Sequence, residues 1–192
     1  LSTLGALDVK GKILAALFQS ITPRTAGFNT LDLTALNSST IFLMIFLMFV
    51  GGSPSSTAGG LKTTTAAVIA CSVWSMIRGK SETILFYRRF DQGTILKAYQ
   101  LFMMLATGII FATFLLNVFE GDNFLYLFFE VTSAFATVGL SCGLTPTFTD
   151  HSKMVLIISM FIGRVGPMTF AYALLHKGSR KVRYPEGKVN VG

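Results

Sequence analysis

The sequence predicts an all-α membrane protein that contains a duplicated pore loop. Hydrophobic residues make up 52% of its 192 residues and charged residues only 13%, about half of the roughly 25% typical of soluble domains. The mean hydropathy is +0.62. A short apolar segment, a Thr-x-Gly pentamer and a long apolar segment also occur twice, in the same order.

The basic character of the chain does not indicate a nucleic-acid-binding protein. The net charge is +7, but the basic residues are spread between apolar runs instead of forming one basic face. The two cysteines, Cys71 and Cys142, offer neither a disulfide framework nor a metal-binding spacing. Because no apolar span precedes the first short helix, we expect the natural protein to be longer and this chain to be its C-terminal part.

Two short apolar segments are each followed by a pentamer of the same type. Leu14 to Ile21 precedes Thr25-Ala26-Gly27-Phe28-Asn29, and Asn123 to Phe135 precedes Thr137-Val138-Gly139-Leu140-Ser141. Both pentamers read Thr, small apolar, Gly, large apolar, then Asn or Ser. Neither short segment can span about 30 Å of hydrocarbon, so we predict two half-membrane helices that each lead into an extended loop.

Such loops suit the binding of a dehydrated potassium ion. Backbone carbonyls aimed at a narrow axis can replace its water shell, and Gly adopts the left-handed angles that this requires. The C-terminal dipole of each short helix also favours a cation. The alternative is that Thr-x-Gly is only a helix-ending turn, but its repetition favours a filter. The predicted filter residues are Thr25, Ala26, Gly27, Phe28, Thr137, Val138, Gly139 and Leu140.

A Gly/Ser/Thr-rich stretch, Gly51 to Thr65, interrupts the next apolar region. The whole region from Thr40 to Ile77 is 38 residues, or about 57 Å as a straight helix, which is too long for one crossing. Each apolar flank is too short for a crossing of its own. We predict one crossing broken by a loop at membrane depth, which is tolerated where the loop is buried in protein or lines a water-filled path. The alternative is a flexible linker outside the membrane.

Two longer helices follow. Leu101 to Phe119 is the clearest predicted spanning helix, and Met154 to Leu175 is a 22-residue apolar helix with Arg164 near its middle. A mid-membrane charge costs roughly 2.5–3.5 kcal/mol, so we expect Arg164 to face the Gly51–Thr65 loop; a purely structural role is the alternative. Lys62 either adds a positive barrier or caps a helix. The predicted gate residues are Gly51, Gly52, Gly59, Gly60, Lys62 and Arg164.

The charge distribution predicts the orientation. The connection 78–97 and the tail after His176 each carry five Lys or Arg residues, which the positive-inside rule places in the cytoplasm. Both pentamers then face outward, and the C-terminus is cytoplasmic. Acidic residues at the outer ends would concentrate cations; these are Asp32, Glu120, Asp122 and Asp150.

Taken together, these motifs resemble the KtrB/TrkH family of potassium-translocating subunits. The resemblance implies tandem repeats of helix, pore helix, filter loop and helix, of the potassium-channel type, with one helix broken by an intramembrane loop. It assigns 1–93 to the end of the third repeat, 94–178 to the fourth and 179–192 to a cytoplasmic tail. The ending Arg183-Tyr184-Pro185-Glu186-Gly187-Lys188 favours the KtrB branch. Two filter segments cannot surround an ion, so this chain alone should not conduct.

The resemblance also implies the function and the partners. It implies potassium uptake across the bacterial plasma membrane by a multi-pass, lipid-embedded homodimer. A cytosolic nucleotide-binding ring of the KtrA type is the implied regulator, with the nucleotide bound only by that partner. Potassium is the implied ion, and sodium is a candidate coupling ion in a symport or an activating ion. No enzyme activity is expected.

Two rival interpretations remain. Broken helices and repeats also build secondary carriers for other solutes, although carriers do not require duplicated Thr-x-Gly loops. Gly139 to Gly143 matches the G-x-S-x-G nucleophile elbow of hydrolases. That motif lacks a preceding strand, and its only candidate bases are His151, in a short outer loop, and His176, on the opposite predicted membrane side.

Overall fold

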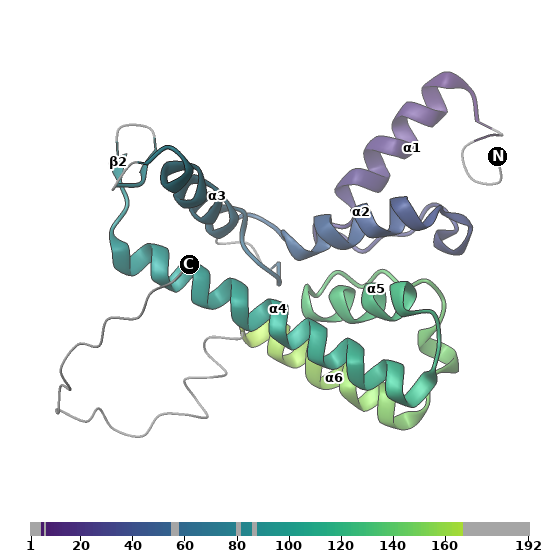
Figure 1. Cartoon of the computed structure of the whole chain (residues 1–192). Helices are drawn as coiled ribbons and strands as arrows, with labels where there is room; N and C mark the ends of the chain where they lie inside the picture. The colour runs from purple at the N-terminus through teal and green to yellow at the C-terminus, as the bar shows by residue number, and fades with distance from the viewer. Residues whose placement is uncertain (1–4, 6, 55–57, 80–81, 86–87, 167–192) are drawn as a thin grey trace.

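The structure is a computed structural model that describes residues 5, 7–54, 58–79, 82–85 and 88–166. In these residues the chain forms six α-helices, two 3-10 turns and one short β-hairpin (Figure 1). The elements are α1 (Val9–Ile21), η1 (Leu33–Ala35), α2 (Ser38–Phe49), α3 (Thr63–Ile77), β1 (Ile84–Leu85), β2 (Arg88–Arg89), α4 (Gln92–Glu120), α5 (Phe124–Phe135), η2 (Thr145–Thr147) and α6 (Asp150–Val165).

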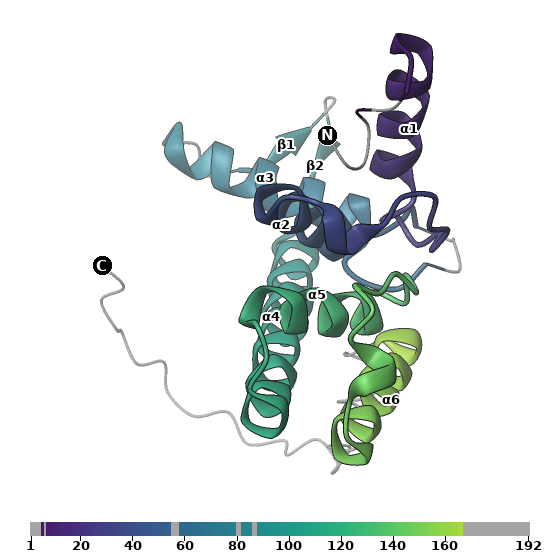
Figure 2. The ribbon, with the colours of Figure 1, turned by 90° about the vertical axis from the view of Figure 1, so that its right-hand side faces the viewer.

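The short helix α5 lies at the centre of the fold. It packs against α4 and α6 on one side and against α2 on the other (Figure 2). Eight of its 12 residues are buried. Leu127 and Val131 join one apolar cluster with residues of α4 and α6, whereas Phe129 joins a second cluster with Ile41 and Met48 of α2. Because both faces of α5 are covered, the loop that follows it starts from a fixed position.

The helix α4 is the one described helix that is long and apolar enough to cross a membrane, judged by length and composition. It has 29 residues, and its side chains Ile110, Phe111 and Phe114 are exposed. The predicted span Leu101 to Phe119 is therefore confirmed as a helix. It begins nine residues earlier than predicted because the Asp91 side chain accepts a hydrogen bond from the Gly93 N–H (3.0 Å) and caps its first turn.

The predicted helix Met154 to Leu175 differs from the structure. The helix α6 begins earlier, at Asp150, and Gly166 ends it with φ 91°. Residues 167–175 of the prediction lie outside the described residues. Arg164 therefore lies in the last turn of the described helix, and not near its middle.

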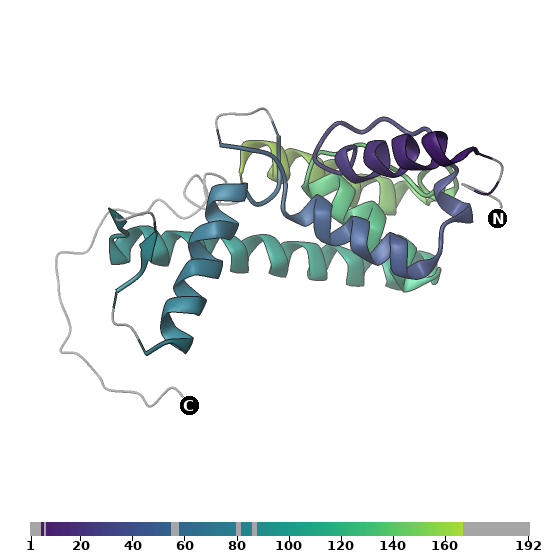
Figure 3. The ribbon, with the colours of Figure 1, turned by 90° about the horizontal axis from the view of Figure 1, so that it is seen from above.

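Both short helices predicted before the pentamers are present, as α1 and α5. The helix α1 begins at Val9 because the Asp8 carboxylate accepts from the Gly11 N–H (2.8 Å). The connection after α3 contains an unpredicted antiparallel hairpin, with Ile84 opposite Arg89. Figure 3 shows α3 crossing α4 near the N-terminal end of α4, where Val68 packs with Ile95 and Ala98.

A close approach between α5 and α6 depends on Gly163. A Cβ atom at this position would overlap the backbone carbonyl of Phe135. We predict that Gly163→Ala lowers the thermal unfolding midpoint of the full-length protein, because overpacking costs about 1–3 kcal/mol. Ile158→Ala, on an exposed face of the same helix, is the control and should change the midpoint much less. Equal midpoints for the two variants would contradict this packing.

Candidate functional site

The two Thr-x-Gly segments have the same unusual backbone. Thr25 (φ 66°) and Thr137 (φ 53°) are the non-glycine residues with positive φ among those described, and Gly27 (φ 73°) and Gly139 (φ 90°) also have positive φ. A left-handed conformation costs an L-residue roughly 1–2 kcal/mol. Strain of this kind persists where the surroundings impose it, and it is concentrated at functional sites. Here it occurs twice at corresponding positions.

A backbone hydrogen bond joins the end of each short helix to the loop that follows it. The Val138 N–H donates to the Ser133 carbonyl (2.9 Å), and the Gly27 N–H donates to the Thr22 carbonyl (3.2 Å). No described residue donates a hydrogen bond to the six carbonyl oxygens of the Thr-x-Gly residues, which are Thr25, Ala26, Gly27, Thr137, Val138 and Gly139. Carbonyl groups without protein donors are suited to bind a cation or water.

The two segments lie against each other in space. A Cβ atom at Gly27 would overlap the carbonyl oxygen of Val138 and would lie 3.8 Å from the Gly139 Cα. The absence of a side chain at Gly27 therefore permits the contact. The structure thus brings together two of the stretches that the sequence singled out.

The Gly51–Thr65 loop contacts the chain at the start of the second Thr-x-Gly segment, Thr137–Gly139. The Gly59 N–H donates to the Thr137 Oγ1 (3.0 Å), and a Cβ at Gly59 would lie only 2.8 Å from the Ala136 carbonyl oxygen. The Gly51 N–H donates to the Leu61 carbonyl (2.8 Å), which closes the loop at its base. The loop is shorter than predicted, because Thr63 to Thr65 form the first turn of α3. Its described residues, 51–54 and 58–62, pack against the start of Thr137–Leu140. Following the predicted repeats, we call Thr25–Phe28 the third segment and Thr137–Leu140 the fourth segment.

The other predicted gate glycines and Lys62 lie within the same loop. Gly51 and Gly52 line a cavity of about 310 Å³ that also includes Thr25. A Cβ at Gly60 (φ 70°) would lie 3.3 Å from the Ala136 Cβ. The Lys62 Nζ donates to the Ala58 carbonyl within the loop, so this ammonium group contacts the loop backbone.

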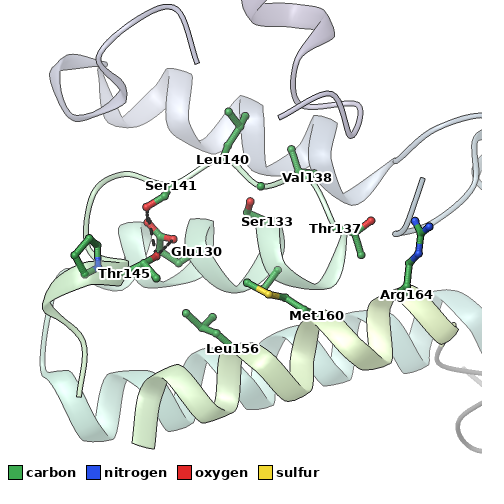
Figure 4. A pocket seen from close by; sticks show the side chains of 13 residues that line it. Glu130, Ser133, Thr137, Val138, Leu140, Ser141, Thr145, Leu156, Met160 and Arg164 are labelled. Carbon is green, nitrogen blue, oxygen red and sulfur yellow. Dashed lines mark hydrogen bonds between the residues drawn. The ribbon is translucent and has the colours of Figure 1, made fainter. Parts of the chain in front are cut away.

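A second cavity of about 620 Å³ lies between α5, α6 and the fourth segment. Thr137 and Arg164 line one end of it, and Glu130, Ser141 and Thr145 line the other (Figure 4). Figure 4 shows the Arg164 side chain beside Thr137. The arginine that the sequence singled out therefore lines the same cavity as Thr137, whose hydroxyl contacts the loop.

The last residue of each predicted filter segment is placed differently from the other. The Phe28 side chain is 69% exposed, and its carbonyl accepts a hydrogen bond from the Thr22 hydroxyl (2.6 Å). Leu140 is buried in the cluster with α2. The two segments therefore share their backbone over Thr-x-Gly but diverge after it.

Sequence reasoning missed Glu130, which lies in α5 with only 4% of its surface exposed. Its carboxylate accepts hydrogen bonds from the residues that follow the fourth segment: Ser141 Oγ (2.7 Å), the Cys142 N–H (2.7 Å) and Thr145 Oγ1 (2.8 Å). A carboxylate in an otherwise apolar helix of a membrane protein is by itself a signal of function.

Two of the four predicted outer acids, Asp32 and Glu120, accept hydrogen bonds at the starts of helical turns. The Thr34 hydroxyl (2.7 Å) and the Thr34 N–H (3.0 Å) both donate to Asp32, and these hydrogen bonds lower the pKa of that carboxyl. The Glu120 carboxylate accepts from the N–H (2.8 Å) and the hydroxyl (2.7 Å) of Thr149 at the start of α6. These acids fix the turns that join the helices.

The sequence matches the TrkH family, described as cation transport proteins, over residues 2–180. It is 43% identical over 190 residues to the Ktr system potassium uptake protein B of Bacillus subtilis, covering 99% of this chain and 43% of that protein. It is 39% identical to the potassium/sodium uptake protein NtpJ of Enterococcus hirae, covering 98% of this chain and 44% of the relative.

The fold also matches a solved structure, the potassium transporter TrkH of Vibrio parahaemolyticus. The TM-score is 0.75 at 22% identity, over 91% of this chain and 39% of that one. The chain spans less than half the length of the relatives just named.

The fold and the matched family define a class of membrane cation transport proteins, which are not enzymes. The chain belongs to the TrkH/KtrB family of cation transport proteins. The G-x-S-x-G match at Gly139 to Gly143 thus lies in a chain of this family, where the Ser141 hydroxyl donates to Glu130.

The contact between the two segments can be tested with two glycines of similar backbone. Gly27 (φ 73°) and Gly79 (φ 67°) incur comparable strain on mutation to Ala, but a Cβ at Gly79 meets nothing within 4 Å. We predict that Gly27→Ala lowers the thermal unfolding midpoint of the purified full-length protein well below that of Gly79→Ala. The reason is the overlap with Val138. Equal midpoints would show that the two segments do not touch.

Proposed function

We propose that the full-length protein takes up potassium across the bacterial plasma membrane through a filter of backbone carbonyls. The observation that carries this proposal is the repeated left-handed Thr and positive-φ Gly in two adjacent segments, whose six carbonyls accept no hydrogen bond from any described residue. The proposed ligand-bearing residues are Thr25, Ala26, Gly27, Phe28, Thr137, Val138, Gly139 and Leu140.

The choice of potassium rests on the carbonyl chemistry and on the relatives. Two relatives of this chain are named as potassium and as potassium/sodium uptake proteins. Each segment contains one Gly, so we expect weaker discrimination than in a Thr-Val-Gly-Tyr-Gly filter. Sodium is therefore a second candidate ion, as a coupling or activating partner.

The proposed assembly is a homodimer in the lipid membrane with a cytosolic KtrA-type ring that binds the regulatory nucleotide. The similarity to a Ktr system protein supports this assembly. The basic connection 78–97 and the basic tail support a cytoplasmic C-terminus and outward-facing filters.

Gly139 provides a test of the filter. Gly139 and Gly121 both have positive φ, and a Cβ at either glycine meets no atom within 4 Å. Gly139→Ser should therefore strain the backbone as much as Gly121→Ser does, but only Gly139→Ser should reduce the preference for potassium over sodium. Rubidium uptake into vesicles, with sodium as competitor, measures this preference. An unchanged preference in a folded Gly139→Ser protein would refute the filter.

The loop from Gly51 to Thr65 is the proposed gate. The hydrogen bond between Gly59 and Thr137 supports this role, since it connects the loop directly to the proposed filter. Arg164 lies beside Thr137, where a fixed positive charge would raise the barrier to cations. Regulatory subunits would act by shifting the loop between two arrangements that differ by a few kcal/mol.

Shortening the loop tests the gate. Removal of Ser53 to Ala58 should raise rubidium flux and leave the potassium/sodium preference largely unchanged. The Phe49–Leu61 and Gly51–Leu61 hydrogen bonds that close the base of the loop lie outside the deletion. The measurement is initial uptake in vesicles that contain equal amounts of wild-type and shortened protein.

A point variant separates gating from a general effect of the deletion. In Gly59→Ala the new methyl group would lie 2.6 Å from the Thr137 Oγ1, so the loop must move away from the filter. We expect Gly59→Ala to raise flux as well. Equal or lower flux from both variants, when folded, would leave a static plug as the better interpretation.

A further inference from the structure

The buried carboxylate of Glu130 joins the pore helix to the chain that leaves the fourth segment. Its Oε1 accepts from the Ser141 hydroxyl and from the Cys142 N–H, both at 2.7 Å, and its Oε2 accepts from the Thr145 hydroxyl at 2.8 Å. Ser141 directly follows Leu140, so the first of these bonds lies one residue beyond the Thr-Val-Gly-Leu segment.

These hydrogen bonds must offset the burial of a charge. Within the described residues, no Lys or Arg forms an ion pair with Glu130. Taking a carboxylate out of water costs free energy. Hydrogen-bond donors to the carboxylate offset that cost. Hydrogen bonds to an ionised group are roughly twice as strong as neutral ones. The loop is therefore held more firmly at these three donors than ordinary turn contacts would hold it.

The third segment has no such contact. Its helix α1 carries Gln19 as a buried polar residue, whose Nε2 donates to the Met44 Sδ (3.4 Å) and whose Oε1 has no partner among the described residues. In that segment the Thr22 hydroxyl donates a hydrogen bond to the Phe28 carbonyl, which is one of the predicted filter carbonyls. In the fourth segment, by contrast, Glu130 binds only N–H and O–H groups that follow it, and it occupies no carbonyl.

We infer that Glu130 is a positioning residue that fixes the outer end of the fourth filter segment, and that the preference for potassium over sodium depends on its hydrogen bonds. The inference rests on the proposed filter. A carboxylate that holds Ser141 and Cys142 sets where the chain leaves Leu140. It thereby restricts how far the preceding carbonyls can move toward a smaller ion.

The test is a series of variants in the full-length protein, with rubidium uptake measured in vesicles against sodium competition. Thr145→Val is nearly isosteric and removes one donor while keeping the carboxylate. Ser141→Ala removes another donor, and Glu130→Gln removes the charge and the acceptor for Thr145. We expect the potassium/sodium preference to fall about threefold in each donor variant, which loses one hydrogen bond to the carboxylate, and roughly tenfold in Glu130→Gln, which loses one and weakens the other two.

The matched control is Glu120→Gln. Glu120 also accepts two hydrogen bonds at the start of a helix, but its donor is Thr149 and not the filter loop. This variant should keep the wild-type preference. Thermal unfolding midpoints identify folded variants, and the nearly isosteric Thr145→Val keeps the test available if Glu130→Gln does not fold.

The outcomes separate this inference from the proposed function. A wild-type protein that takes up rubidium without preferring potassium to sodium would refute the filter itself. If the wild type discriminates and all folded variants discriminate equally well, the positioning role of Glu130 is wrong while the filter stands. A change in Glu130→Gln alone, with Thr145→Val and Ser141→Ala unchanged, would assign the effect to charge and would also overturn the positioning role.

Discussion

The end of α5 is the constraint on which the candidate site depends. The Phe135 carbonyl faces Gly163 of α6, and the Ala136 carbonyl faces Gly59 of the loop. Both approaches require a residue without a side chain, because a Cβ would fall within the contact distance of a backbone oxygen. Two parts of the chain, α6 and the loop, are thus held against one helix terminus. That terminus carries the negative end of the helix dipole, which favours a nearby cation.

Thr137 has two roles at this junction. Its left-handed backbone (φ 53°) begins the fourth segment, and its hydroxyl accepts the hydrogen bond from Gly59. In the proposed pathway, a displacement of the loop breaks this bond at the innermost residue of the filter. The corresponding Thr25 has the same backbone and lines the cavity beside Gly51 and Gly52, but among the described residues no hydrogen bond joins its hydroxyl to the loop. Loop movement would therefore affect the two segments unequally.

The sequence predicts the parts of this arrangement that depend on pattern and length. Duplication revealed the two pentamers, and the helix-length argument revealed the loop, because both are properties of the chain itself. The starts of α1 and α4 were predicted poorly, since they depend on capping by Asp8 and Asp91, whereas the start of α5 was predicted to within one residue. The carboxylate of Glu130 in an apolar helix was itself a signal, but its role could not be predicted because its donors lie 11 to 15 residues further along the chain. Only the folded structure shows which loop returns to a buried carboxylate.

The two segments also differ in how many lone pairs they leave for an ion. A carbonyl oxygen has two lone pairs, and the Thr22 hydroxyl occupies one of those at Phe28. No described residue donates to the Leu140 carbonyl, because Glu130 binds the donors that follow it. At the outer end of the fourth segment, the Leu140 carbonyl oxygen therefore has more lone pairs available for an ion than the Phe28 carbonyl oxygen of the third segment. In a filter formed by non-identical segments, this difference makes the ion's environment asymmetric, unlike that in a pore built from identical subunits.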